Sequence, residues 1–326
     1  MKIFLVITID TEIDKSPDWK ISADETFLSV LDGIPKKLTP LFNRFGAKPT
    51  YLLSSEVMEN KECVSLLKSI DNCELGTHLH GDLVEPQRKV YKLANTRTGA
   101  MQNSYPKEIE YQKLKNLTNL FIEKFGFSPS SFRAGRFAAG NNTINSLEKL
   151  GYLVDSSVTP GIDWNLPEGR ANFLGAKEQP YFPGRENLLE KGNSKVLEVP
   201  VSIVPPRLKK YFYALDKVKV LKLVSAIINT ILPPRWLRPS LQNPSGMLGV
   251  ITKLLKRYGM NNAIVLNMMF HSIEVVPNAS PYTKTEDECE ALLGRMGMVL
   301  EYCATNNFSF VTLSELYSVF APEVKR

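Results

Sequence analysis

Residues 2–12, KIFLVITIDTE, form the stretch that decides the fold. An apolar run rich in Ile, Val and Phe ends abruptly in two carboxylates, Asp10 and Glu12. Short runs of this composition are typical of β-strands. Asp10 and Glu12 are two residues apart, so along an extended strand both side chains point to one face. The stretch therefore predicts a strand with paired acids at its carboxyl end.

Seven further apolar runs read as strands, and helical patterns separate many of them. The strands are expected at 49–54, 73–80, 131–137, 152–158, 195–204, 263–271 and 308–316, and the helices at 25–46, 111–126, 143–151 and 287–306. Gly126 and Gly151 end two of these helices, as C-cap glycines do. Alternation of this kind predicts a parallel α/β architecture, in which functional residues gather at the carboxyl ends of the strands.

Composition describes an ordinary globular chain of 326 residues, with 43% hydrophobic and 23% charged residues. This length fits one barrel-like domain with an insertion as well as it fits two domains. The four cysteines form no CxxC and read as reduced thiols. The first residues lack the features of a signal peptide, and no run reaches the roughly 18 apolar residues of a membrane span. The expected location is the cytoplasm.

The positive charge of the chain is concentrated in one segment. Between residues 201 and 260, eleven Lys or Arg face a single acid, Asp216, within a formal net charge of +6 for the whole chain. As a helix, the middle of this segment would have an apolar face formed by Leu221, Val224, Ile227, Ile228 and Ile231. Such a helix suits either an anionic membrane surface or packing on the barrel with a solvated basic side.

The three histidines of the chain, His78, His80 and His271, all stand where strand-like runs end. His78 and His80 repeat the two-residue spacing of the acids at the end of the first strand. Imidazole and carboxylate groups that meet at one rim of a sheet are the ligands and proton carriers of hydrolytic metal sites. The pattern therefore predicts a metal-dependent hydrolase.

The order of these segments resembles the polysaccharide deacetylase family, that is, the NodB homology domain or the fold of carbohydrate esterase family 4. It is most similar to the branch with a D-x-E first motif (Asp10, Glu12) and an H-x-H second motif (His78, His80). The resemblance covers residues 1–201 and 263–316. It implies a distorted (β/α) barrel in a single catalytic domain, 1–326, with an inserted basic helical segment at 205–259.

The resemblance also implies roles for the acidic and basic residues of the site. Asp10 matches the general base, and Arg133 matches the arginine that holds this base. Asp155 matches the acid that orients the arginine. Thr11 replaces the usual aspartate ligand, so Glu12 is expected to bind the metal together with His78 and His80, with Asp82 as an alternative ligand to His80. Zinc is the preferred ion, with cobalt and nickel as alternatives.

At the leaving-group side, His271 matches the general acid and Glu274 is expected to orient it. Arg136 replaces a tyrosine whose backbone N–H helps to bind the oxyanion, and a backbone donor survives that change. The implied reaction removes an N-acyl (acetyl) group from an amino sugar in a glycan or a glycan precursor.

The sequence allows two alternative functions, and it also allows contact with a membrane. The chain is alternatively a hydrolase of another C–N or ester bond, such as a deformylase, or a non-catalytic glycan-binding relative. A lipid-linked substrate would bring residues 207–238 to the inner face of the membrane as a peripheral contact. No motif of nucleic-acid recognition accompanies the basic segment, so no nucleic-acid partner is expected.

Overall fold

The computed structural model describes residues 1–21, 25–89, 99–166, 169–205 and 233–321. Its centre is an eight-stranded parallel sheet in the order β11-β1-β2-β3-β4-β5-β8, with β12 pairing β1 beside this path. The strands are β1 (Lys2–Thr11), β2 (Pro49–Leu53), β3 (Glu74–Leu79), β4 (Ser131–Ala134), β5 (Val154–Asp155), β8 (Leu197–Glu198), β11 (Ala263–His271) and β12 (Ser309–Phe310).

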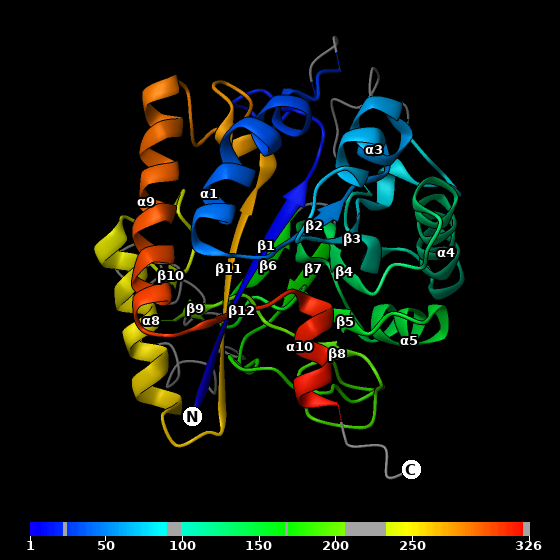
Figure 1. The fold of residues 1–326 in the computed structure, drawn as a ribbon. Helices are drawn as coiled ribbons and strands as arrows, with labels where there is room; N and C mark the ends of the chain where they lie inside the picture. Colours follow the sequence, from blue (N-terminus) through cyan, green and yellow to red (C-terminus); the bar gives the residue numbers. More distant parts are fainter. Residues whose placement is uncertain (22–24, 90–98, 167–168, 206–232, 322–326) are drawn as a thin grey trace, which may run out of the picture.

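Helices surround this sheet, as Figure 1 shows. They are the π-helical segment η1 (Ser29–Leu38), α1 (Thr39–Phe45), α2 (Ser55–Glu59), α3 (Lys61–Lys68), α4 (Lys107–Phe125), α5 (Asn141–Leu150), α8 (Pro244–Tyr258), α9 (Glu286–Thr305) and α10 (Leu313–Phe320). Gly126 and Gly151 adopt φ of 83° and 84° at the ends of α4 and α5, as expected of C-cap residues. The prediction of a parallel α/β barrel is confirmed.

Two short stretches of the chain, around residues 202 and 237, lie beside β11 where the sheet does not continue to β8. The N–H of Ser202 donates to the carbonyl of Asn267 on β11 (3.1 Å) and its carbonyl accepts from the N–H of Leu237 (2.8 Å). The N–H of Met269 in turn donates to the carbonyl of Leu237 (3.3 Å). Residues around 202 and 237 thus stand where a further strand would complete the barrel, which explains its distorted form.

Four expected strands differ from the structure. The strand expected at 131–137 covers only Ser131–Ala134, and the one expected at 152–158 covers only Val154–Asp155. The other two differ more. Residues 195–204 form β8 and a separate strand, β9 (Ile203–Val204), and the chain between them contains Pro200, which has no N–H for a sheet ladder. In 308–316 only Ser309–Phe310 is strand. There Thr312 caps α10, its hydroxyl accepting from the N–H of Glu315 while the Glu315 carboxylate accepts from the N–H of Thr312. This capping box is the sequence signal for a helix start.

A small hairpin, β6 (Asp163–Leu166) with β7 (Gly169–Asn172), was not anticipated from the sequence. Its strands are partly exposed and lack a long apolar run. Trp164 of this hairpin stacks on Phe137, which follows β4 (ring centroids 5.5 Å apart). The hairpin therefore lies beside the carboxyl end of β4.

The described part of the basic segment, residues 233–259, contributes to the barrel wall. It forms β10 (Arg235–Trp236), antiparallel to β9, and then α8. Trp236 and Arg238, two members of the set expected to face a membrane, are buried. The predicted apolar face from Leu221 to Ile231 lies outside the described residues, and the domain and insertion boundaries stay a prediction.

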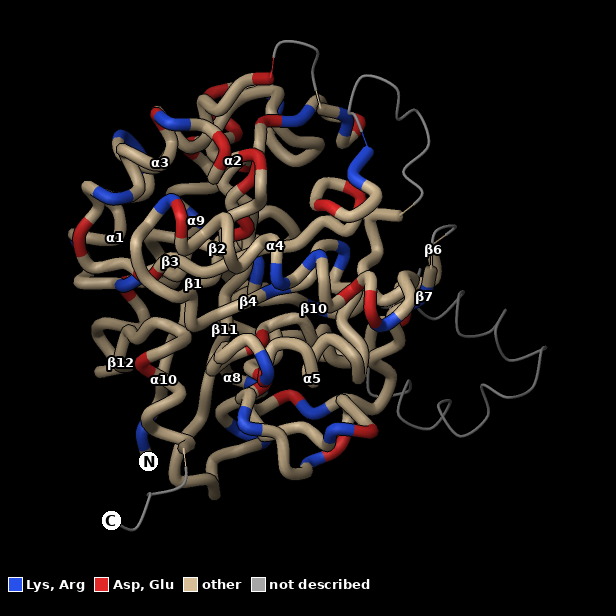
Figure 2. Tube along the Cα trace, turned by 90° about the vertical axis from the view of Figure 1, so that its right-hand side faces the viewer, with Lys and Arg blue, Asp and Glu red and all other residues tan. Residues whose placement is uncertain are grey.

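Acidic residues are interspersed among the basic ones along the described chain, as Figure 2 shows. Within the described ranges, no helix combines the length and the apolar character needed to cross a bilayer.

Candidate active site

The parallel register brings the polar strand ends to one rim of the sheet. Asp10 of β1 pairs with His271 of β11, and His78 of β3 pairs with Arg133 of β4. All four side chains are buried or nearly so. Residues that lie far apart along the chain therefore meet because adjacent parallel strands end at the same edge.

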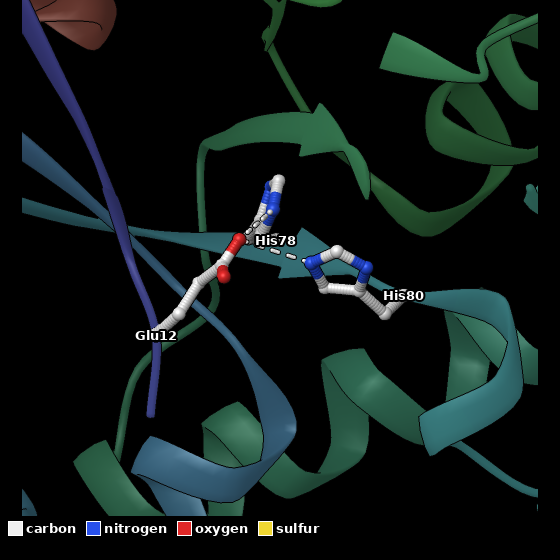
Figure 3. A group of neighbouring side chains, drawn as sticks. All are labelled: Glu12, His78 and His80. Atoms are coloured by element: carbon white, nitrogen blue, oxygen red, sulfur yellow. Dashed lines mark hydrogen bonds and ion pairs between the residues drawn. The ribbon is translucent and has the colours of Figure 1, made fainter. Parts of the chain in front are cut away.

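Glu12, His78 and His80 form a candidate metal site (Figure 3). Oε1 of Glu12 lies 3.1 Å from Nε2 of His78 and 3.0 Å from Nε2 of His80, and the three ligand atoms lie within 4.8 Å of one another. Ligands of a tetrahedral ion with bonds of about 2.0–2.1 Å are separated by about 3.3 Å. The observed spacing therefore fits a small divalent ion with little movement of the side chains.

Hydrogen bonding and burial prepare the two imidazoles for ligation. Nδ1 of His78 donates to the backbone carbonyl of Arg133 (3.1 Å), which leaves its Nε2 lone pair directed at Glu12. Burial lowers the pKa of His78, and burial together with the neighbouring His78 lowers the pKa of His80 well below its usual value. Both rings are therefore neutral at neutral pH, the form that binds metals.

Asp82 is buried but is not part of this group of three. The geometry thus favours His80 over Asp82, the alternative considered from the sequence, as the third ligand. Lys15, which the sequence did not single out, places its ammonium group against Oε2 of Glu12. A cation already contacts the second oxygen of this carboxylate.

Arg133 holds Asp10 at the centre of the site. Its Nη1 donates to Oδ1 of Asp10 (2.7 Å), and both side chains are almost fully buried. Burial alone would raise the pKa of Asp10, but the Arg133 guanidinium, with His78 and His271 nearby, holds this pKa far below its usual range. Asp10 is therefore ionised at neutral pH, as a proton acceptor must be.

Contacts around the Arg133 guanidinium differ from the sequence expectation. Nε donates to the carbonyl of Ser156 (2.7 Å), and Nη2 donates to the hydroxyls of Thr8 (2.7 Å) and Ser156 (2.9 Å). The carboxylate of Asp155 instead accepts from the hydroxyl of Ser157 (2.5 Å). Ser156 and Thr8 therefore orient Arg133 directly, and Asp155 influences it only through its charge.

Asp155 is one half of a buried pair of acids. It stands opposite Glu198 in the register of β5 and β8, and both side chains are fully buried. Burial raises the pKa of Asp155, and burial together with the Asp155 charge raises the pKa of Glu198 further. Two neighbouring buried carboxyl groups cannot both ionise at low cost, so the pair holds a proton at neutral pH.

His271 is held by Glu274 and by Arg238, a residue of the basic segment. Nδ1 of His271 lies 2.9 Å from Oε1 of Glu274, and Nη2 of Arg238 donates to the same oxygen (2.5 Å). The opposite ring nitrogen, Nε2, lies 3.8 Å from Oδ2 of Asp10. Burial lowers the pKa of His271, and the charge of Arg238 lowers it further. The hydrogen bond to Glu274 acts in the opposite direction.

Trp19, an aromatic residue on the loop after β1, flanks the side chain of His271. The indole of Trp19 meets its imidazole edge to face, with ring centroids 5.3 Å apart, and Tyr282 contacts Trp19 in turn (5.8 Å). Trp19 has a φ of 60°, uncommon for a residue with a side chain. Asp14 anchors the loop by accepting from the N–H groups of Leu28 (2.6 Å) and Ser29 (3.1 Å).

Arg136 stands in the tight turn after β4, beside the candidate metal site. It has a φ of 56°, and a Cβ atom on the preceding Gly135 would lie 2.6 Å from the carbonyl oxygen of Leu79 and 2.8 Å from Nδ1 of His80. Only glycine allows β4 and the His80 ring to approach this closely. The turn therefore places the backbone of Arg136 near the ligands, and its role at the oxyanion stays a prediction.

Sequence reasoning missed Lys15, Trp19, Thr8, Ser156 and Arg238. Thr8 lies two residues before Asp10 and therefore on the same face of β1, but the sequence does not show that Arg133 reaches its hydroxyl. Arg238 was interpreted as part of a basic surface, because nothing local distinguishes a buried arginine from its exposed neighbours.

Comparison with known proteins gives matches of fold. No family model and no curated protein matches the sequence. A solved structure from Mycobacterium smegmatis, assigned as a polysaccharide deacetylase, is 14% identical, with a TM-score of 0.52 over 98% of this chain and 90% of that one. A structure from Parabacteroides distasonis, assigned as a glycoside hydrolase/deacetylase, is 13% identical, with a TM-score of 0.64 over 98% of this chain and 71% of that one.

A GH57 branching enzyme from Thermococcus kodakaraensis is also similar. It is 11% identical, with a TM-score of 0.51 over 99% of this chain and 72% of the enzyme. The chain thus has the α/β fold, with a partial parallel barrel, that deacetylases share with GH57 enzymes. At these identities the likeness concerns the fold alone.

Proposed function

We propose that the protein is a metal-dependent hydrolase that removes an N-acyl group from an amino sugar. The observation that carries this proposal is the arrangement around Asp10. Its ionised carboxylate lies 3.8 Å from the imidazole of His271 and is influenced by the nearby His78, one of the three candidate metal ligands. The fold that the chain shares with carbohydrate-active enzymes supports a glycan or glycan precursor as substrate.

The residues divide the work of amide hydrolysis. A divalent ion bound to Glu12, His78 and His80 would supply Lewis acidity to the carbonyl group and to the attacking water. Asp10 accepts a proton from this water, whose oxygen forms the new bond to the acyl carbon. The C–N bond then breaks, and His271 donates a proton to the leaving nitrogen. The backbone N–H of Arg136 donates a hydrogen bond to the oxyanion.

Two histidines and one carboxylate are a common ligand set of catalytic zinc, with a fourth position open for water or substrate. Zinc is therefore the ion that we propose, with cobalt and nickel as alternatives. Ion identity is decided by loading metal-free protein with each ion in turn and comparing affinity and turnover.

The proposed substrate is a precursor, free or lipid-linked, that the enzyme meets in the cytoplasm. The excess of basic residues between 201 and 260, with the buried Arg238 left aside, supports contact with an anionic membrane face. Flotation with vesicles that contain anionic lipid tests this part. Failure to bind them at moderate salt would remove the lipid-linked substrate from the proposal.

Metal content, followed by turnover of acylated amino sugars, tests the proposed function. Protein purified without chelator is expected to carry close to one divalent ion, and the His78→Ala, His80→Ala double variant none. Asp10→Asn should retain the ion and lose turnover, whereas Asp71→Asn, an exposed acid, serves as the matched control. Wild-type protein that binds no zinc, cobalt or nickel would contradict the proposal and favour the glycan-binding alternative.

A further inference from the structure

We propose that Arg238 is a positioning residue that sets both the orientation and the charge state of His271. This inference rests on the proposed function insofar as His271 protonates the leaving nitrogen. Its structural part concerns a contact between the stretch around residue 237 and the end of β11, and it can be measured without substrate.

Arg238, His271 and Glu274 meet around one carboxylate oxygen. Oε1 of Glu274 accepts from Nη2 of Arg238 (2.5 Å), lies 2.9 Å from Nδ1 of His271 and also accepts from the backbone N–H of His271 (3.2 Å). Nη2 of Arg238 also lies 3.0 Å from Nδ1 of His271 itself. Because the Glu274 carboxylate can only accept, Nδ1 carries the proton in the contact with Glu274, and Nε2 is the nitrogen that faces Asp10. The arginine and the imidazole thus share one acceptor, which determines the direction of the ring.

Glu274 and Arg238 are both buried. Glu274 has no exposed surface, and Arg238 is 5% exposed. A buried carboxylate without a partner would take up a proton instead of remaining charged. Arg238 keeps Glu274 ionised, and an ionised Glu274 is the form that accepts a hydrogen bond from Nδ1–H.

Arg238 is itself held in place by its neighbours. Its Nε donates to the hydroxyl of Ser240 (2.9 Å), and its guanidinium lies over the ring of Tyr282, 4.9 Å from the centroid. The preceding residue, Leu237, is hydrogen bonded to Ser202 and to Met269 of β11. Main-chain and side-chain contacts therefore both hold the guanidinium beside β11.

These contacts have an electrostatic consequence for His271. The charged groups that face the imidazole are Asp10 on β1, Glu274 on the turn after β11, and Arg238, while Trp19 and Tyr282 are aromatic neighbours on that side. Without the arginine, His271 would be the remaining charge partner of the buried Glu274, which would then stay ionised only while His271 is protonated. The imidazolium form would then be favoured, and its proton would be donated less readily.

The experiment uses the fact that the chain contains only three histidines. Imidazole signals of metal-free protein are followed by NMR as the pH is varied, and His271→Gln identifies the His271 signal. In Arg238→Met, the His271 pKa is expected to rise by about one unit or more. Arg238→Lys, which keeps the charge, should shift it less. Arg235→Met removes an exposed arginine three residues earlier and should leave it unchanged.

A double variant, Arg238→Met with Glu274→Gln, separates positioning from a loss of folding. It removes both buried charges, so it should fold if Arg238→Met is unstable only because Glu274 becomes unpaired. Its His271 ring should lose the preference for the Nδ1–H tautomer, which the imidazole nitrogen shifts report. An unchanged pKa and tautomer of His271 in folded variants would overturn the proposal.

Measurement of turnover tests whether Arg238 also affects catalysis. If the proposed activity is found, Arg238→Met should lower kcat about tenfold to a hundredfold with little change in KM, and Arg238→Lys should recover part of it. A wild-type kcat in Arg238→Met, when His271→Gln is inactive, would overturn the positioning role. If no substrate is turned over, the proposed function fails, and the NMR titration still decides the structural part.

Discussion

Nε2 of His271 lies 3.8 Å from Oδ2 of Asp10, across adjacent strands whose register pairs these two residues directly. The separation is too long for a hydrogen bond and leaves the two groups facing the same small space. Each group has a second partner. Arg133 donates a hydrogen bond to Asp10, and Glu274 contacts Nδ1 of His271, the ring nitrogen on the far side from Asp10. The proposed acceptor and the proposed donor of the proton are thus held close to each other without being hydrogen bonded.

Loss of the Arg133 charge should shift the pH dependence of hydrolysis. In Arg133→Met, the guanidinium that offsets the effect of burial on Asp10 is lost, so the pKa of Asp10 rises. Asp10 is then protonated at a higher pH than in the wild type. The acid limb of the kcat/KM profile is expected to move upward by at least about one unit. Arg170→Met, an exposed variant, is the control, and an unmoved acid limb in folded protein would contradict the assigned pair.

Divalent ions should stabilise the folded protein through His78. Ligands that bind only the folded state add about 2.7 kcal/mol at a concentration one hundred times Kd. Thermal unfolding of metal-free wild type is therefore expected to shift upward with added zinc, whereas His78→Ala should show little shift. An equal shift in both proteins would place the ion elsewhere.

Lys15→Met should bind the divalent ion more tightly than wild type. The Lys15 ammonium contacts Glu12, so it competes with the ion for this carboxylate and repels its charge. Titration calorimetry is expected to show an affinity higher by about tenfold. Lys20→Met, an exposed change in the same loop, should have no effect. Weaker binding in Lys15→Met would show that the lysine supports the site.

Glu198→Gln should change how stability depends on pH. The raised pKa values of Asp155 and Glu198 mean that the folded chain keeps a proton that the unfolded chain has lost. The free energy of unfolding of wild type therefore falls as pH rises above the ordinary glutamate pKa, by at most about 1.4 kcal/mol per pH unit from this proton.

The amide that Glu198→Gln introduces would occupy the place of the protonated acid without a proton to lose. Urea unfolding at pH 5, 6.5 and 8 is expected to show a stability difference, variant minus wild type, that grows with pH. A difference of the same size at all three values would refute the shared proton.

The sequence predicted the features that depend on local pattern. The apolar run from Ile3 to Ile9 indicated β1, and Gly126 and Gly151 marked two helix ends by the conformations that only glycine adopts easily. Parallel strands end at a common edge, so the positions of Asp10, Glu12, His78, His80 and His271 after such runs were enough to predict a shared site. The period of the side chains placed each pair on one face.

Only the tertiary structure decided which partners complete these groups. Arg238 is indistinguishable in sequence from the exposed Arg235, yet the position of residue 237 beside β11 buries it against Glu274. Asp155 faces Glu198 and not Arg133, because the register of β5 and β8, set by strand pairing, brings the two acids opposite each other. Sequence periodicity determines the face of a strand on which a side chain lies, whereas its neighbour across the barrel depends on strand order and register, which arise only when the whole sheet closes.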